Sequence, residues 1–160
     1  NPTSMGLWGK KGDVWYRGAE FYYDSRKEHR QKTDQEYARD LKALAGGRRL
    51  QGVIVDPSAA SFLEVLRREG LPVRKAKNDV LSGIRLTAQL LKEGRLVICQ
   101  GCADALREFG LYRWDTGGTG GDRVVKEHDH AMDDIRYFAA TVAAGQTGGF
   151  FAGSVERDSR

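Results

Sequence analysis

The stretch GVIVDPSAASFLEVLRREG, residues 52–70, changes its hydrophobic pattern within a few positions. Residues 53–55 form a short continuous apolar run, which is typical of a strand covered on both faces of its sheet. After this run, apolar residues recur at helical spacing, and Ser58 is expected to cap that helix. A buried strand that leads at once into an amphipathic helix predicts an α/β fold.

The same alternation continues on both sides of this stretch. Residues 3–23 predict two strands around a turn, and residues 33–47 predict a helix that starts with a capping box. Further strands are expected at 71–76, 95–99 and 111–115, and further helices at 78–94 with Asn78 as the cap, at 102–110 and at 130–144. The sequence therefore predicts one α/β domain over residues 1–144, with a mixed sheet flanked by helices, and a flexible glycine-rich tail over residues 145–160.

Composition and charge narrow the class of protein. The chain has 160 residues, is 40% hydrophobic and carries a net charge of +4, as expected of one globular domain. Its Lys and Arg residues lie in small scattered groups, which permit nucleic-acid binding and equally fit ordinary solvated faces. No apolar run approaches the roughly 20 residues that cross a bilayer, and no signal-type segment is present, so we expect a soluble intracellular protein without a membrane partner.

Two segments carry carboxylates at positions that suit a site. Asp56 ends the predicted buried strand, and ligands of open α/β sheets bind beyond the carboxyl ends of the strands. The segment VKEHDHAMDDIRYFAA, residues 125–140, places His130 and Asp133 on one face of a predicted helix. Asp134 follows at about 100° around the helix, so one of the two aspartates is expected to face inward and the other outward. A plain cap at Asp56 and an acidic first helical turn are the simpler interpretations.

Taken together, the two segments favour a metal site. Oxygen ligands from carboxylates suit Mg²⁺ and Mn²⁺. Two such ions about 4 Å apart activate a water molecule and stabilise the leaving oxygen in phosphodiester hydrolysis. A basic α/β domain that brings Asp56, Asp133 and His130 to one site is therefore predicted to be a nuclease.

The order of several segments is similar to that of a known family. These segments are NPTSMGLWG, DVWYRGAEFYYDSRKEHRQKTDQEYARDL, VIVDPSAASFLEVLR, AKNDVLSGIR, YRWD and, above all, VKEHDHAMDDIRYF. Over most of its length the chain resembles the C-terminal nuclease domain of the large terminase subunit of tailed bacteriophages, which has an RNase H-like fold. The resemblance implies an endonuclease that cuts concatemeric double-stranded DNA during viral packaging, with two Mg²⁺ or Mn²⁺ ions as cofactors.

The resemblance also implies which residues are catalytic. The family's second catalytic aspartate falls on Asp56 and its last on Asp133, with His130 as the adjacent metal-site histidine. The family's first aspartate ends a strand upstream of the segment NPTSMG. We therefore expect a truncated first strand and a site without one of its three carboxylates, which would weaken metal binding and cleavage. Glu20 is expected to be either a peripheral ligand or an edge residue.

DNA contacts and partners follow from the same resemblance. Lys75, Lys77 and Lys126 lie on segments near the family's cleft and could contact phosphates, although solvated lysines are the simpler interpretation. The implied partners are the portal protein, the small terminase subunit and the ATPase domain of the same polypeptide, in the cytoplasm of an infected or lysogenic bacterial host. No G-x-x-x-x-G-K-[ST] motif occurs, so the chain itself is not expected to bind ATP.

Other interpretations stay open. Cys99 and Cys102 could join His128 and His130 as ligands of a structural zinc, or could form a redox pair, whereas two buried small side chains are the simpler interpretation. The chain could also be a non-catalytic DNA-binding or motor-docking module. The loop TGGTGGD, residues 116–122, is expected either to gate the cleft or to act as a plain linker.

Overall fold

A six-stranded sheet in the order β4-β3-β8-β1-β2-β5 forms the centre of the molecule. The computed structural model describes residues 2–111, 114–115, 123–124, 129–145 and 149–155. The strands of this sheet are β1 (Pro2–Lys11), β2 (Val14–Asp24), β3 (Leu50–Val55), β4 (Val73–Lys75), β5 (Leu96–Ile98) and β8 (Phe150–Val155). β1 is antiparallel to β2 and β8, whereas β3 is parallel to β4 and β8, and β2 is parallel to β5. The predicted mixed sheet is confirmed.

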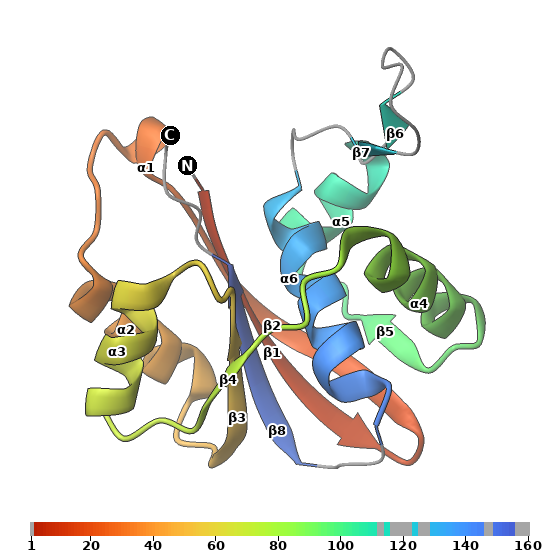
Figure 1. The fold of residues 1–160 in the computed structure, drawn as a ribbon, viewed down its shortest axis with the longest axis horizontal. Helices are drawn as coiled ribbons and strands as arrows, with labels where there is room; N and C mark the ends of the chain where they lie inside the picture. The colour runs from red at the N-terminus through yellow and green to blue at the C-terminus, as the bar shows by residue number, and fades with distance from the viewer. Residues whose placement is uncertain (1, 112–113, 116–122, 125–128, 146–148, 156–160) are drawn as a thin grey trace.

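Helices cover both faces of the sheet (Figure 1). On one side lie α2 (Asp34–Ala45) and α3 (Ala60–Arg68), and on the other lie α4 (Val80–Lys92), α5 (Ala103–Leu111) and α6 (His130–Phe138). The remaining described elements are α1 (Ser25–Glu28), the π-helical turn η1 (Ala139–Ala143) after α6, and a two-stranded sheet of β6 (Trp114–Asp115) and β7 (Arg123–Val124). A separate apolar core packs between the sheet and each helical layer. None of the helices in the described ranges is long and apolar enough to cross a membrane.

A β-bulge in the first hairpin decides which side chains of β2 face α6. The register of the two strands changes between Leu7 and Trp8 of β1, so that Gly18 is the extra residue of β2. Side chains of a strand normally alternate between the two faces, and a bulge shifts that alternation by one position. Arg17 and Glu20, three positions apart, therefore project from the same face, where they form an ion pair of 3.3 Å.

Two helix caps differ from their predictions, whereas the predicted capping box of α2 is confirmed. Ser58 does not cap α3, because both its backbone N–H and its hydroxyl donate to the carboxylate of Asp56. Asp79, and not Asn78, caps α4. In both places a carboxylate accepts the available hydrogen bonds, as expected because a charged acceptor binds donors more strongly than a neutral one.

The predicted flexible tail is wrong for residues 150–155. These residues form β8, which lies in the middle of the sheet between β1 and β3. Phe151 and Ser154 are buried there, and the neighbouring strands pair with the backbone of β8 on both sides. The single domain therefore extends to the end of β8. Residues 146–148 and 156–160 of the predicted tail lie outside the described ranges.

Candidate functional site

An aromatic cluster holds α6 against the sheet. Phe138 stacks on Trp8 with ring centroids 4.1 Å apart, and it meets Trp15 in an edge contact at 5.2 Å. Every residue from Ala131 to Phe138 is buried, and the helix contacts β1, β8, α4 and α5. A charged side chain on this helix must therefore find its partners inside the protein.

Asp133 and Asp134 are both buried, with exposed fractions of 1% and 0%. The prediction that one of them faces outward is wrong, because α6 is covered on more sides than its spacing of apolar residues indicates. The two side chains enter different polar clusters, each defined here by four residues. The strand-end cluster consists of Asp56, Asp133, Arg136 and Tyr137. The sheet-side cluster consists of Ser4, Arg17, Glu20 and Asp134.

In the strand-end cluster, Asp56 connects the end of β3 to α6. Its Oδ2 accepts a hydrogen bond of 3.1 Å from the hydroxyl of Tyr137. Its Oδ1 accepts bonds of 2.9 Å from both the backbone N–H and the hydroxyl of Ser58. Burial, together with the charge of Asp56, raises the pKa of Tyr137 to about 12, so the phenol keeps its proton and remains a donor. Asp133 lies one helical turn before Tyr137, so both aspartates lie against one stretch of α6.

Arg136 holds the other carboxylate of the strand-end cluster. Its Nη2 donates to Oδ1 of Asp133 at 3.1 Å. Its Nη1 donates to the carbonyl oxygens of Asn78 and Asp79 at 2.9 and 3.2 Å. The guanidinium carbon also lies 4.7 Å from the centre of the Tyr137 ring. Arg136 therefore connects a carboxylate of α6 to the start of α4 and to the tyrosine that binds the end of β3.

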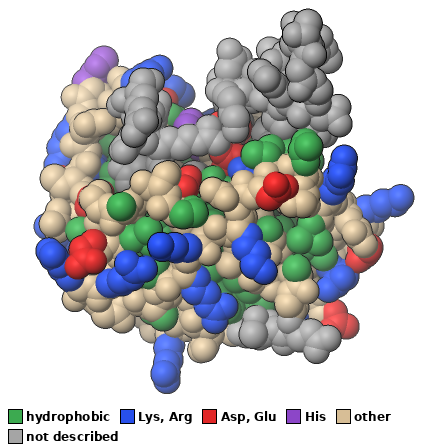
Figure 2. All heavy atoms as spheres, viewed as in Figure 1, with side chains coloured by type: hydrophobic (Ala, Val, Ile, Leu, Met, Phe, Trp, Pro, Cys, Tyr) green, Lys and Arg blue, Asp and Glu red, His purple; other side chains and the backbone are tan. Residues whose placement is uncertain are grey.

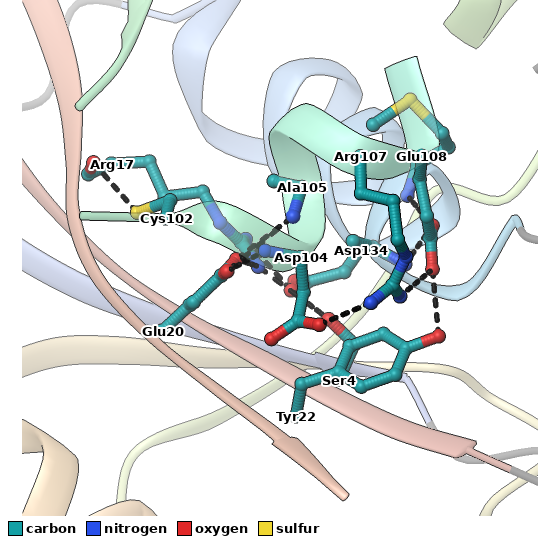
Figure 3. Close-up of polar contacts among 12 residues, drawn as sticks. Ser4, Arg17, Glu20, Tyr22, Cys102, Asp104, Ala105, Arg107, Glu108 and Asp134 are labelled. Carbon is teal, nitrogen blue, oxygen red and sulfur yellow. Dashed lines mark hydrogen bonds and ion pairs between the residues drawn. The ribbon is translucent and has the colours of Figure 1, made fainter. Parts of the chain in front are cut away.

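The sheet-side cluster is a buried ion pair of Arg17 and Asp134, which Ser4 and Glu20 also contact (Figure 3). Nη1 of Arg17 lies 2.8 Å from Oδ2 of Asp134, both side chains are fully buried, and the hydroxyl of Ser4 donates to the same oxygen at 3.3 Å. Burial raises the pKa of Asp134 to about 6, against the opposing effect of Arg17. The pKa of Arg17 is raised although burial opposes its charge, because Asp134 and Glu20 favour the charged form. Arg17 therefore stays charged, and Asp134 is the member of the pair that gains a proton first.

Two buried carboxylates start the helices of this layer (Figure 3). Glu20 accepts hydrogen bonds from the backbone N–H groups of Asp104 at 2.7 Å and Ala105 at 3.3 Å, at the start of α5. Glu108 of α5 accepts one of 2.7 Å from Ala131, at the start of α6. Negative charge is favourable at a helix N-terminus, where backbone N–H groups lack helical partners. Glu20, expected to be a peripheral ligand or an edge residue, thus caps the N-terminus of α5 with its carboxylate.

Sequence reasoning missed three of these charged residues, and two of them had a signal. Arg17 follows Trp15 at strand spacing, so it shares a buried face and requires a countercharge there. Arg136 lies three positions after Asp133, a spacing that pairs side chains on a helix. Glu108 had no local signal, because the backbone group that it binds lies 23 positions away in the chain.

The donor set fits a hard divalent cation in part. Asp56 and Asp133 supply carboxylate oxygens, and Mg²⁺ is commonly held by one or two carboxylates together with water and substrate phosphates. Within the described residues, however, no three or more His, Cys, Asp or Glu side chains are placed so that they could hold a metal ion together. The structure thus does not gather His130, which opens α6 and is half-buried, into such a group with the two aspartates. The assignment of all three residues stays a prediction.

The cysteines do not favour the zinc or redox interpretation. Cys102 is fully buried, and its thiol donates to the backbone carbonyl of Arg17 at 3.3 Å. Burial raises the pKa of this thiol to about 11, which disfavours the thiolate that both zinc binding and redox exchange require. Cys99 is half-buried, and both cysteines are free. His128, the fourth predicted zinc ligand, lies outside the described residues.

Two of the predicted DNA-binding lysines are exposed near the end of β3. Lys75 ends β4 and pairs in register with Val55, the residue before Asp56, and Lys77 follows two positions later. The face seen in Figure 2 carries Lys and Arg side chains spread among other residues, not gathered in one block. Lys126 and the loop 116–122 lie outside the part of the chain that the structure describes.

Comparisons with known proteins agree on one family. Residues 8–141 match the family model described as the terminase RNaseH-like domain. The chain is similar to the large terminase of a thermophilic bacteriophage in complex with ADP, with 47% identity over 91% of this chain and 37% of that chain and a TM-score of 0.88. The structure of the same terminase with ATP-gamma-S gives 47% identity, coverage of 89% and 37%, and a TM-score of 0.86. The chain thus spans 37% of the length of these structures, and no curated protein matches it.

Proposed function

The chain belongs to the terminase RNaseH-like domain family, and from that premise we propose that it cuts concatemeric double-stranded viral DNA. Membership of the family confirms the resemblance expected from the sequence, including the RNase H-like fold. The proposed reaction is metal-dependent hydrolysis of a phosphodiester bond. One observation carries this proposal: two buried aspartates from distant parts of the sequence are bound to adjacent residues of α6, Asp56 to Tyr137 and Asp133 to Arg136.

Asp56 and Asp133 would hold the metal ion through their carboxylate oxygens. Mg²⁺ or Mn²⁺, when bound there, would activate a water molecule and stabilise the leaving oxygen. The contribution of the protein is orientation, because both carboxylates are buried and each is held by hydrogen bonds from neighbouring side chains. A site for two ions requires further ligands, for which we propose His130 and the aspartate that the family carries on a strand preceding β1.

DNA would approach this site across exposed basic side chains. Lys75 lies beside the end of β3, and Lys77 is exposed two positions later. We assign phosphate contacts to both and to Lys126, and such contacts would be independent of base sequence and sensitive to salt. By family likeness, the partners would be the ATPase domain of the same polypeptide, the portal protein and the small terminase subunit, in the cytoplasm of a bacterial host.

A second candidate function is a DNA-binding or motor-docking module that does not cut. The observation that favours it is that the described residues gather no metal site of three or more ligands. Such a module would bind DNA through its basic residues and would be indifferent to Mn²⁺. The two candidates therefore differ in metal uptake and in cleavage, but not in DNA affinity.

Cleavage of supercoiled plasmid in Mn²⁺ tests the proposal. We expect the chain, extended upstream to include the family's first aspartate, to nick the plasmid. In that extended chain, Asp133→Asn and Asp56→Asn should abolish nicking, because each removes the charge of a metal ligand and keeps the size of the side chain. Asp40→Asn is the matched control, since Asp40 lies on α2, across the sheet from α6, and pairs there with Lys32 at 2.8 Å. Full nicking by Asp133→Asn would contradict the assignment. Salt-sensitive DNA binding without nicking or Mn²⁺ uptake would establish the second candidate instead.

A further inference from the structure

We propose that Arg136 and Tyr137 form a clamp that sets the relative orientation of the Asp56 and Asp133 carboxylates and thereby determines how tightly a divalent cation binds. The inference rests on the proposed function, because it concerns the same two carboxylates. It assigns a positioning role to two neighbouring residues that are given no contact with DNA or metal in the proposed reaction. The contacts of Arg136 with Asp133 and of Tyr137 with Asp56 support this inference.

The arginine side of the clamp is rigid. Arg136 is 3% exposed. Its guanidinium donates to three oxygens, one from Asp133 and two from backbone carbonyls at the start of α4. A guanidinium is planar with donors in a fixed fork, so two backbone anchors fix the direction of the third bond. The Asp133 carboxylate is therefore held from one side by a group that cannot rotate independently of α4.

A glycine of α4 makes this position of the arginine possible. A Cβ atom at Gly83 would lie 2.5 Å from Cγ and 2.9 Å from Cδ of Arg136. These atoms belong to the buried stem of the side chain, so a substitution at Gly83 would push the guanidinium away from its three acceptors. Gly83 is itself buried within α4. The helix thus carries a residue of poor helical propensity where the arginine needs space.

The tyrosine side completes the clamp. The hydroxyl of Tyr137 donates to Oδ2 of Asp56, while Ser58 occupies Oδ1, so both oxygens of that carboxylate are oriented. The ring of Tyr137 lies under the guanidinium of Arg136 at 4.7 Å, which couples the two halves of the clamp through a cation–π contact. A displacement of either residue would therefore change the angle between the two carboxylates.

The clamp is not needed to seat α6. Phe138 stacks on Trp8 in the apolar core, and Asp134 is paired with Arg17 on the face of the sheet. These contacts lie on other sides of the helix and stay in place when Tyr137 loses its hydroxyl. Loss of the clamp should therefore alter metal affinity much more than it alters the position of the helix.

Mn²⁺ affinity measured by isothermal titration calorimetry on the complete chain tests the clamp. We expect Tyr137→Phe to weaken Mn²⁺ binding by about 10- to 100-fold, the range usual for groups that orient metal ligands. Tyr22→Phe is the matched control, because its hydroxyl also donates to a buried carboxylate, that of Glu108, at 2.8 Å. Both variants remove one such bond, so both should lose similar stability, but Tyr22→Phe should bind Mn²⁺ like the unaltered chain.

A second pair of variants reaches the clamp from another element. Gly83→Ala should weaken Mn²⁺ binding as Tyr137→Phe does, whereas Gly110→Ala, in helix α5 with open space around its Cβ, should not. Arg136→Lys should bind Mn²⁺ less tightly than the unaltered chain, because a lysine keeps the charge but cannot reach all three acceptors.

The outcomes separate the clamp from the function on which it rests. If the unaltered chain takes up no Mn²⁺, or if Asp56→Asn and Asp133→Asn bind it normally, both the function and the clamp are overturned. If those two variants lose binding while Tyr137→Phe and Gly83→Ala match their controls, the clamp alone is wrong. The expected result is loss of binding in all four variants, complete in the aspartate pair and partial in the clamp pair.

Discussion

The two polar clusters of α6 contain the same charges in different surroundings. Each has one arginine and two carboxylates: Arg17 with Glu20 and Asp134, and Arg136 with Asp133 and Asp56. Arg17 lies over Gly6 as Arg136 lies over Gly83, so in both clusters the absence of a side chain makes room for the guanidinium. In the sheet-side cluster, however, the second carboxylate is used to start a helix, whereas in the strand-end cluster it lies at the end of a strand with an exposed fraction of 6%.

This difference separates a structural cluster from a candidate functional one. A buried ion pair must recover the free energy lost when its charges leave water, and hydrogen bonds to the remaining oxygens are what recover it. In the sheet-side cluster, on the face of the sheet beneath α6, protein groups bind Oδ2 of Asp134 and both oxygens of Glu20, whereas Oδ1 of Asp134 is buried without a hydrogen-bond partner. The strand-end cluster has the same net charge of −1 but lies at the end of β3, where Val55 pairs in register with the exposed Lys75.

Removal of Arg17 should have the largest effect on stability. Arg17→Gln leaves Asp134 buried without a countercharge, and breaking a buried pair in this way costs about 3–5 kcal/mol. Urea denaturation followed by circular dichroism would measure the loss. The double variant Arg17→Met with Asp134→Leu should recover most of it, because the remaining carboxylate, Glu20, still accepts hydrogen bonds from the backbone N–H groups at the start of α5. A loss below about 1 kcal/mol in Arg17→Gln, typical of an ordinary hydrogen bond, would contradict the structural role.

The pH dependence of stability should identify Asp134 as the titrating member of its pair. Its pKa of about 6 in the folded protein is above the ordinary value of 3.8, so the folded chain binds the proton more tightly than the unfolded chain does. The stabilisation is complete below the ordinary value and is lost as the pH rises to about 6. The free energy of unfolding of the unaltered chain should therefore fall, relative to that of Asp134→Asn, by at most about 3 kcal/mol over this interval.

Urea titrations of both proteins at a series of pH values would measure this difference. The comparison with Asp134→Asn isolates one group, because other carboxylates titrate equally in both proteins. Two parallel profiles would mean that Asp134 binds its proton equally tightly in the folded and the unfolded chain, and the raised pKa of Asp134 would then be wrong.

The elements that the sequence predicts correctly are those decided locally. The first hairpin, the capped helix α2 and the strand before Asp56 follow from alternation, turn residues and capping pairs within a few positions. β8 could not be predicted in this way. The strand is only six residues long and follows glycines. Its burial depends on β1 and β3, which are far away in the chain. A central strand of this kind is specified by the space left between its neighbours.

The sequence marks the two carboxylates of the candidate site but not the side chains that orient them. Asp56 and Asp133 are marked by a strand end and by a helical face, which are short-range patterns. The partition of Asp133 and Asp134 into two clusters depends on what covers α6, which no spacing reveals. The bulge at Gly18, which places Arg17 beneath Asp134 and next to Glu20, has only one local signal, a glycine inside a strand.

Filling the space under Arg17 should have an intermediate effect. A Cβ at Gly6 would lie 1.9 Å from Nη1 of Arg17, and this end of the side chain is held by Asp134 and cannot swing away. Gly6→Ala should therefore cost about 1–3 kcal/mol, the range for overpacked cores. Gly18→Ala is the control, since nothing lies within 4 Å of its Cβ position. Thermal or urea unfolding would measure both, and equal stabilities would mean that the pair tolerates displacement.

The smallest expected effect is the most informative about the two clusters, because it compares one hydroxyl from each. Ser4 donates to Asp134 at 3.3 Å and lies in the core, so Ser4→Ala should cost about 0.5–1 kcal/mol of stability and leave Mn²⁺ affinity unchanged. Ser58 donates to Asp56 at 2.9 Å and is exposed, so Ser58→Ala should cost less stability but should weaken Mn²⁺ binding, because one oxygen of the carboxylate is then held only by a backbone N–H. Urea denaturation would measure the stability of these two variants, and calorimetry would measure their Mn²⁺ affinity. If both variants lost stability and neither lost Mn²⁺ affinity, the strand-end cluster would be a second structural ion pair, and the two clusters would have the same role.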